Sequence, residues 1–69
     1  MQYKPVVMLA NGAEDGICKG SRFEIRSKIG AAPGYKVVEV RGKDRLLVDF
    51  NAPSIAAARE AIEKYMEEV

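Results

Sequence analysis

Alternating apolar and polar positions mark two segments of the chain most clearly, residues 22–29 and 45–50. Between residues 22 and 29, Phe23, Ile25 and Ile29 share one face and charged side chains occupy the other. This is the period-two pattern of a strand with one buried face. Three further runs, rich in β-branched or aliphatic residues and bounded by glycine, proline or asparagine, also predict strands. The predicted strands span about residues 5–10, 22–29, 35–41 and 45–50.

The last quarter of the chain changes to a helical period. Pro53 suits the first turn of a helix, where its missing N–H would have no partner, and either Asn51 or Ser54 can supply the capping oxygen. We therefore expect one amphipathic helix over about residues 53–68. Its apolar stripe consists of Ile55, Ala58, Ile62, Tyr65, Met66 and Val69.

Together these elements predict an α+β fold in one small domain, residues 1–69. Its sheet is mostly antiparallel and four-stranded (β-β-β-β-α), with the C-terminal amphipathic helix packed on one face. Since one helix covers only one face, the core is expected between helix and sheet. The predicted core residues are Val6, Met8, Phe23, Ile25, Ile29, Val38, Val40, Leu46, Val48, Phe50, Ile55, Ala58, Ile62, Tyr65 and Met66.

Residues 11–21 (NGAEDGICKGS) interrupt these patterns. They contain three glycines and mixed charges without periodicity, which predicts an irregular connection, with a hairpin at Asn11-Gly12 as one alternative. Such a connection is long for a small domain, and long loops often carry function. A flexible hairpin end is the favoured interpretation, and Glu14 and Asp15 are then expected to be solvated acids.

The residue inventory leaves little for catalysis. The chain has no histidine and a single cysteine, Cys18, so a cysteine–histidine pair, an internal disulfide and a cysteine-only zinc site are all excluded. Lys19 and Arg22 favour the thiolate of Cys18, but without a base we expect an incidental small residue. We predict a non-enzymatic protein with no catalytic residue, cofactor or metal site. Without a disulfide, a signal peptide or a membrane span, it is expected in the cytoplasm and not on a membrane.

The charge distribution changes the picture more than the net charge of +1 does. Residues 16–45 hold eight basic and three acidic side chains, whereas residues 46–69 hold two basic and five acidic ones. A basic sheet surface is one footprint of nucleic-acid binding, although such binding also favours exposed aromatic residues, and Phe23 and Phe50 are expected in the core. The predicted nucleic-acid contacts are Arg22, Arg26, Lys28, Lys36, Arg41, Lys43 and Arg45.

Four apolar residues, Val7, Leu9, Val37 and Leu47, fall opposite the predicted core pattern. One helix cannot cover them, and a contiguous exposed apolar patch usually marks a partner surface. The leading prediction is therefore an interaction module that binds another protein or itself, most simply as a homodimer, through the open sheet face or an edge strand. Nucleic-acid binding through the basic surface is the alternative.

Two resemblances extend these expectations. The order of four strands and a helix is similar to that of the PUR-repeat single-strand binders, which dimerise and bind nucleic acid on a curved sheet; the likeness is of topology alone and implies no site residue. The run from Val48 to Ile62 (VDFNAPSIAAAREAI) resembles a strand–cap–helix ending of short phage and mobile-element proteins. That resemblance implies a small regulator or inhibitor.

Overall fold

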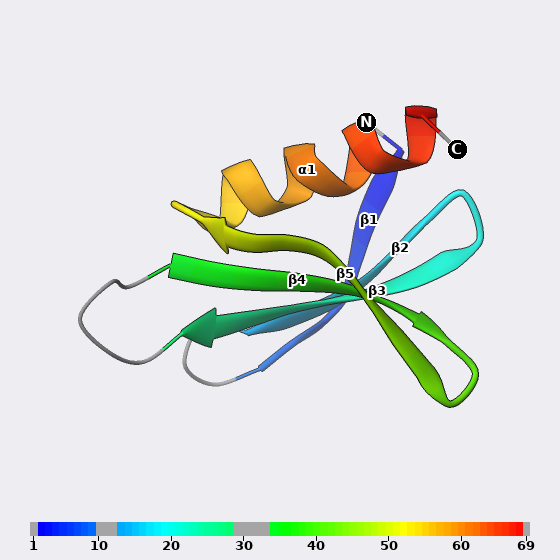
Figure 1. Cartoon of the computed structure of the whole chain (residues 1–69), viewed down its shortest axis with the longest axis horizontal. Coiled ribbons are helices and arrows are strands. Elements are labelled where there is room, and N and C mark those ends of the chain that lie inside the picture. Colours follow the sequence, from blue (N-terminus) through cyan, green and yellow to red (C-terminus); the bar gives the residue numbers. More distant parts are fainter. Residues whose placement is uncertain (1, 10–12, 29–33, 69) are drawn as a thin grey trace.

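The chain folds as one antiparallel sheet with a helix across one face (Figure 1). The computed structural model describes residues 2–9, 13–28 and 34–68. Its five strands follow one another across the sheet in chain order, each antiparallel to the next, and the sheet is strongly twisted (Figure 1). The elements are β1 (Tyr3–Met8), β2 (Glu14–Cys18), β3 (Ser21–Lys28), β4 (Gly34–Arg41), β5 (Asp44–Ala52) and α1 (Ile55–Glu68).

The predicted α+β class and the C-terminal helix are confirmed, but the sheet has five strands instead of four. The additional strand, β2, lies in the segment that was expected to be irregular. Its inward positions alternate normally, yet they carry Glu14, Gly16 and Cys18, so the pattern lacks the apolar signature of a strand. Gly16 is required there because a Cβ would collide with the ring of Tyr3, which lies across it. The Asn11-Gly12 alternative falls outside the described residues.

A two-residue turn joins β2 to β3. Lys19 and Gly20 both have positive φ, 50° and 85°, as the type I′ hairpin turn requires. Lysine has no special preference for this conformation, so the sequence Lys-Gly gives a weaker hairpin signal than Asn-Gly does.

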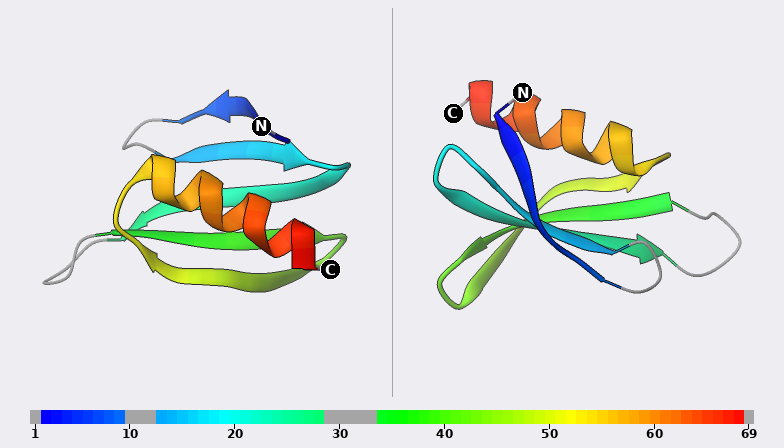
Figure 2. Two further views of the ribbon diagram at one scale, coloured as in Figure 1. Left: turned by 90° about the horizontal axis from the view of Figure 1, so that it is seen from above. Right: turned by 180° about the vertical axis from the view of Figure 1, so that it is seen from behind.

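The core lies between α1 and the face of the sheet beneath it (Figure 2). Phe23, Ile25, Ala58 and Ile62 are fully buried there, as predicted. The ring of Phe23 meets that of Tyr65 edge to face, with centroids 6.1 Å apart. Val48, Ile55, Tyr65 and Met66 pack partly buried around this centre, which also includes four residues that the sequence did not assign to it: Tyr3, Cys18, Val37 and Ala52.

Four predicted core residues are instead exposed: Val6, Met8, Leu46 and Phe50. For Phe50 the cause is a pair of register shifts opposite Tyr35–Val38, each of which inserts an extra residue in β5. A bulge reverses the alternation that follows it, so Phe50 turns away from the helix although Leu46 and Val48 face it. A register shift at Pro5–Val7 in β1 similarly disturbs Val6. Val38 and Val40 lie on the face opposite the helix, and Ile29 is outside the described residues.

The helix begins at Ile55, two residues later than expected, so Pro53 precedes its first turn instead of lying in it. The structure also decides the cap. The Ser54 hydroxyl accepts a hydrogen bond from the Ala57 N–H at 3.1 Å, so Ser54, and not Asn51, supplies the capping oxygen. Across residues 2–9, 13–28 and 34–68, no helix combines the length and apolarity that crossing a membrane requires.

Candidate binding face

The sheet face opposite α1 carries no covering element within the described part of the chain (Figure 2). Strand register lines its side chains up in rows across all five strands. One row runs Val7, Asp15, Glu24, Val38, Leu47, and its neighbour runs Lys4, Ile17, Arg22, Val40, Arg45. We call this surface, together with Val6, Arg26, Lys28, Lys36 and Phe50, the open face.

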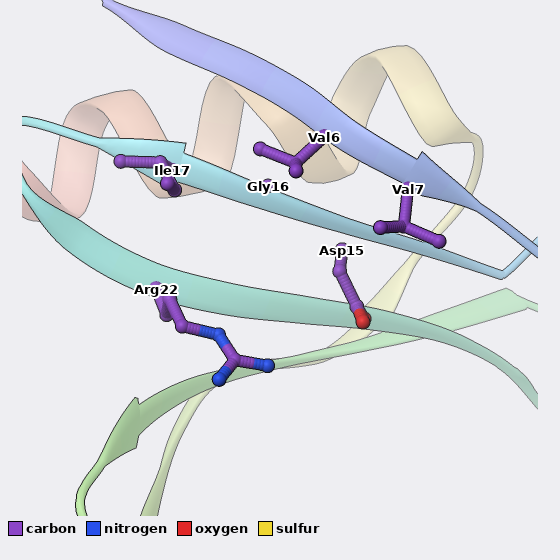
Figure 3. A pocket seen from close by; sticks show the side chains of 6 residues that line it. All are labelled: Val6, Val7, Asp15, Gly16, Ile17 and Arg22. Atoms are coloured by element: carbon purple, nitrogen blue, oxygen red, sulfur yellow. The ribbon is translucent and has the colours of Figure 1, made fainter.

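Apolar side chains on the open face gather into two shallow hollows at opposite ends of these rows. The first, of about 280 Å³, lies over β1 and β2 (Figure 3); it is lined by Val6, Val7, Asp15, Gly16, Ile17 and Arg22. The second, of about 320 Å³, lies over β4 and β5; it is lined by Lys36, Val38, Arg45, Leu47 and Phe50. Ile17 remains 40% exposed, Leu47 57% and Phe50 58%. Each hollow therefore offers an unfilled apolar floor beside at least one cation.

The acids of the open face are neutralised by neighbouring arginines. Arg26 Nη1 lies 2.8 Å from Asp15 Oδ1, and its other terminal nitrogen lies 3.6 Å from Glu24. Arg45 Nε also contacts Glu24, at 3.3 Å. Among the described residues the remaining cations of the open face have no ion-pair partner; they are Lys4, Arg22, Lys28 and Lys36.

Lys28 and Phe50 form the one contact between a cation and an aromatic ring recorded for the described residues. The ammonium of Lys28 sits 3.9 Å from the centroid of the Phe50 ring, a cation–π geometry. Phe50 is thus an exposed aromatic residue among cations. Its burial was predicted from an alternation that the β5 bulges reverse.

Five of the seven predicted nucleic-acid contacts share the open face: Arg22, Arg26, Lys28, Lys36 and Arg45. The other two do not. Arg41 points to the helix side, where its Nε lies 3.1 Å from Glu39. Lys43 is exposed in the turn between β4 and β5. The basic segment therefore forms a surface smaller than the seven residues suggest.

The four residues of the predicted protein interface do not lie together in the structure. Val7 and Leu47 line the two hollows, and Leu9 is exposed just after β1. Val37, however, is fully buried beneath the helix, so its expected place on the uncovered face is wrong. Val37 and Val38 are adjacent and point to opposite faces, and it is Val38, predicted to be a core residue, that lies on the open face. Ile17 was missed because its strand was not recognised.

Both edges of the sheet are poorly suited to adding a further strand. On β1, the Tyr3 N–H donates to a Glu63 carboxylate oxygen at 3.4 Å, Pro5 has no N–H, and the register shift at Pro5–Val7 breaks the ladder. On β5, the two register shifts interrupt the edge. Proline and bulges are recognised protections of sheet edges.

Buried polar groups lie on the helix side. Glu14, only 1% exposed, accepts hydrogen bonds from the Tyr3 hydroxyl at 2.8 Å and from two nitrogens of Arg59 at 3.0 and 2.7 Å. The Arg59 bonds lower the pKa of Glu14. Burial, and then the bond to Glu14, raise the pKa of Tyr3 above its usual range.

A second contact repeats this arrangement further along α1. The Tyr65 hydroxyl donates to Glu39 at 2.8 Å, and this bond raises the Tyr65 pKa. In both places a carboxylate of a strand binds a side chain of α1. Satisfied partners and burial fit a structural role for Glu14 and Glu39.

Cys18 belongs to the same buried side. Its side chain is fully buried, and burial, followed by the charge of Glu63, raises the pKa of its thiol. The effect of Lys19 is opposite but smaller. Within the described ranges, no three histidine, cysteine or acidic side chains are grouped as metal ligands would be.

Comparison with protein-family models, with curated proteins and with solved structures finds no match to this chain.

Proposed function

We propose that this chain is a non-enzymatic binding module that docks a protein partner on the open face of its sheet. The observation that carries the proposal is the pair of apolar hollows on the face that α1 leaves uncovered. An exposed Phe and several exposed aliphatic side chains on one face are costly to leave in water, and covering each recovers roughly 1–2 kcal/mol. A contiguous surface of this kind usually serves recognition.

The open face is a better candidate than either edge. The Tyr3 N–H is engaged by Glu63, Pro5 has no N–H to donate, and bulges interrupt the β5 edge. A partner that docks through side chains needs none of these backbone groups. The sequence pattern predicts docking on the open face or pairing at an edge strand. Because the edges are poorly suited to pairing, we propose docking on the open face.

A second copy of this chain is the simplest protein partner. In a face-to-face homodimer, however, the unpaired cations of both copies, Lys4, Arg22, Lys28 and Lys36, would be gathered at one interface. Like charges without acids between them weaken such a pair, and salt would strengthen it by screening. Sedimentation velocity at low and high salt tests the homodimer: an unchanged monomer at both, over a wide concentration range, removes it.

Site-specific cross-linking tests the proposed docking face. Leu47 is replaced by the photo-reactive residue benzoylphenylalanine in one variant, and the exposed helix residue Ala56 in a control. In a lysate of the source cell, we expect a discrete protein adduct at position 47 but not at position 56. Adding Ile17→Lys in the other hollow should abolish the adduct. Equal adducts at both positions, or insensitivity to Ile17→Lys, would contradict docking on the open face.

Nucleic-acid binding is the second candidate, favoured by one observation: Phe50 is exposed and neighbours cations. An aromatic ring on a basic sheet can stack a base, worth about 1–3 kcal/mol. The test titrates labelled single- and double-stranded oligonucleotides at two salt concentrations with the parent and with Phe50→Ala. Phosphate contacts must strengthen at low salt, so absent binding there excludes this candidate.

The proposed role is that of a small accessory protein, a regulator or inhibitor that acts by occupying its partner. The unpaired thiol of Cys18, buried in the core, suits a reducing compartment. We accordingly propose that the protein acts in the cytoplasm.

A further inference from the structure

The two hollows of the open face have a definite spacing. The first is lined from β1, β2 and β3, and the second from β4 and β5, so we take their centres to lie over β2 and between β4 and β5. Val7 and Leu47, which line them, belong to one continuous row across the five strands, so the hollows lie at the same level along the sheet. Two and a half strand spacings of about 4.8 Å separate their centres by roughly 12 Å.

A polypeptide in extended conformation matches that spacing. It advances about 3.3 Å per residue, so roughly 12 Å corresponds to four residues, and side chains at positions i and i+4 of an extended chain point to the same side. Two large apolar side chains four residues apart can therefore enter both hollows from one segment that crosses the strands.

The charges between and around the hollows indicate which charge the remaining residues of the bound segment carry. Asp15 and Glu24 are engaged by Arg26 and Arg45. Arg22 at the first hollow and Lys36 at the second have no acid partner among the described residues. An acidic segment would supply the missing countercharges.

We propose that the open face binds an acidic, extended peptide segment of its partner, whose two large apolar residues stand four positions apart and fill the two hollows. This inference rests on the proposed function and names the chemistry of the partner. A second copy offers the basic face poor complementarity. Among the described residues of the open face, single-stranded nucleic acid would find only the ring of Phe50 to stack on, since no aromatic side chain lines the first hollow.

Synthetic peptides test the spacing and the charge. The probe is a fluorescein-labelled nonapeptide, Glu-Asp-Phe-Glu-Asp-Glu-Leu-Asp-Glu, titrated with the intact chain by fluorescence anisotropy at two salt concentrations. One control moves the leucine one position earlier, which turns it to the opposite side of an extended chain. Another replaces every acid by lysine. We expect saturable binding of the probe that weakens with salt and at least tenfold weaker binding of each control.

Variants locate the site. Ile17→Ser and Phe50→Ser each remove an apolar side chain from one hollow. Each is expected to lower the affinity for the probe about tenfold. Leu46→Ser is the matched control, because Leu46 is also exposed on β5 but pairs with Glu39 on the helix side. Lys36→Gln should weaken binding and its salt dependence, whereas Lys64→Gln on the exposed side of α1 should not. Circular dichroism confirms that each variant is folded.

The outcomes separate this inference from the proposed function. No binding of the acidic probe, equal binding of the lysine peptide, or equal loss with Leu46→Ser would overturn it. The inference would also be overturned if an oligonucleotide bound more tightly than the probe and the Phe50→Ser variant lost that binding. If position 47 still cross-links a partner protein while the probe fails to bind, the docking face stands and only the acidic segment is rejected.

Discussion

Glu14 shows what a single buried charge does in so small a domain. Its carboxylate joins β2 to β1 through Tyr3 and to α1 through Arg59. Three hydrogen bonds compensate for the removal of the charge from water, which would otherwise cost several kcal/mol. The expectation that Glu14 is a solvated loop acid is therefore wrong. Its neighbour Asp15, on the open face, is only partly exposed and pairs with Arg26.

Replacing Glu14 should lower the free energy of unfolding and make that free energy depend less on pH in the acidic range. Glu14→Gln leaves Arg59 without its countercharge, and we expect the free energy of unfolding to fall by about 2 kcal/mol. The folded pKa of Glu14 is lowered, chiefly by Arg59, below the ordinary 4.5. This contribution is therefore complete above pH 4.5 and is lost as the pH falls through the lower folded pKa. Urea unfolding across this range should show a smaller loss in Glu14→Gln than in the parent.

The double variant Glu14→Met with Arg59→Met is the control. Removing both members of a buried pair leaves no unpaired charge, so it should be less destabilised than the sum of the two single variants. Additive losses would contradict direct coupling between the two side chains.

Cys18 provides a second prediction for a single residue. Because the thiol is fully buried and its pKa is raised, it should react with a disulfide reagent about a hundredfold or more slowly in the native protein than in urea. The control, Cys18→Ala with Ser27→Cys, places the thiol at an exposed site of β3 and should react at similar rates in both. Fast labelling of the native parent would show that Cys18 is accessible.

Among the secondary-structure elements, the hairpin of β2 and β3 is where the sequence is least typical of its structure. Positive φ at both Lys19 and Gly20 costs little at glycine but about 1 kcal/mol at other residues, with asparagine tolerating it best. The strand that this turn pairs with β3 supplies Glu14 and Cys18 to the helix side and Ile17 to the open face. The turn thus positions both surfaces.

Substitutions in this turn should change stability in opposite directions. Lys19→Asn creates the Asn-Gly pair that type I′ turns prefer and should raise the free energy of unfolding by about 0.5 kcal/mol. Gly20→Ala should lower it by about 1 kcal/mol, although space is available for the methyl group. Urea denaturation midpoints measure both. Gly42→Ala, at φ 58° in the next hairpin turn, should resemble Gly20→Ala, and a neutral result at both would contradict the strain argument.

At the scale of the whole molecule, the two sides of the sheet differ in what they hold. The helix side holds the core and the buried ion pair, and the open face holds the uncompensated cations and the two hollows. The exposed end of β1 is apolar, with Met8 76% exposed, yet its backbone is poorly arranged for pairing. The edge is therefore poorly suited to pairing, which agrees with the proposed docking on the open face.

Restoring a backbone N–H to the β1 edge should promote association between chains. Pro5→Val supplies an N–H and a strand-forming side chain to β1, and we expect a larger associated fraction than in the parent by sedimentation velocity. Pro53→Ala, outside the strands, is the control and should leave association unchanged. A Pro5→Val protein that associates no more than the parent would show that Pro5 does not protect the edge.

The sequence by itself determined the α+β class, the strands with clear alternation, the amphipathic helix and the central core of Phe23, Ile25, Ala58 and Ile62. These follow from local periodicity, which each segment carries in its own residues. The presence of a basic surface could also be predicted, since five of the seven predicted residues lie at alternating positions of strands that pair in sequence.

Only the tertiary structure decided the remaining points. Strand β2 exists because Glu14 and Gly16 find partners in Arg59 and Tyr3, which are distant in the chain. The β5 bulges turn Phe50 outward while Val37 is enclosed by the helix. The local pattern indicates how apolar residues alternate along a strand. Long-range packing and strand register decide which of these residues lie on the face of the sheet that the helix covers. For this protein, that choice separates its core from its candidate binding face.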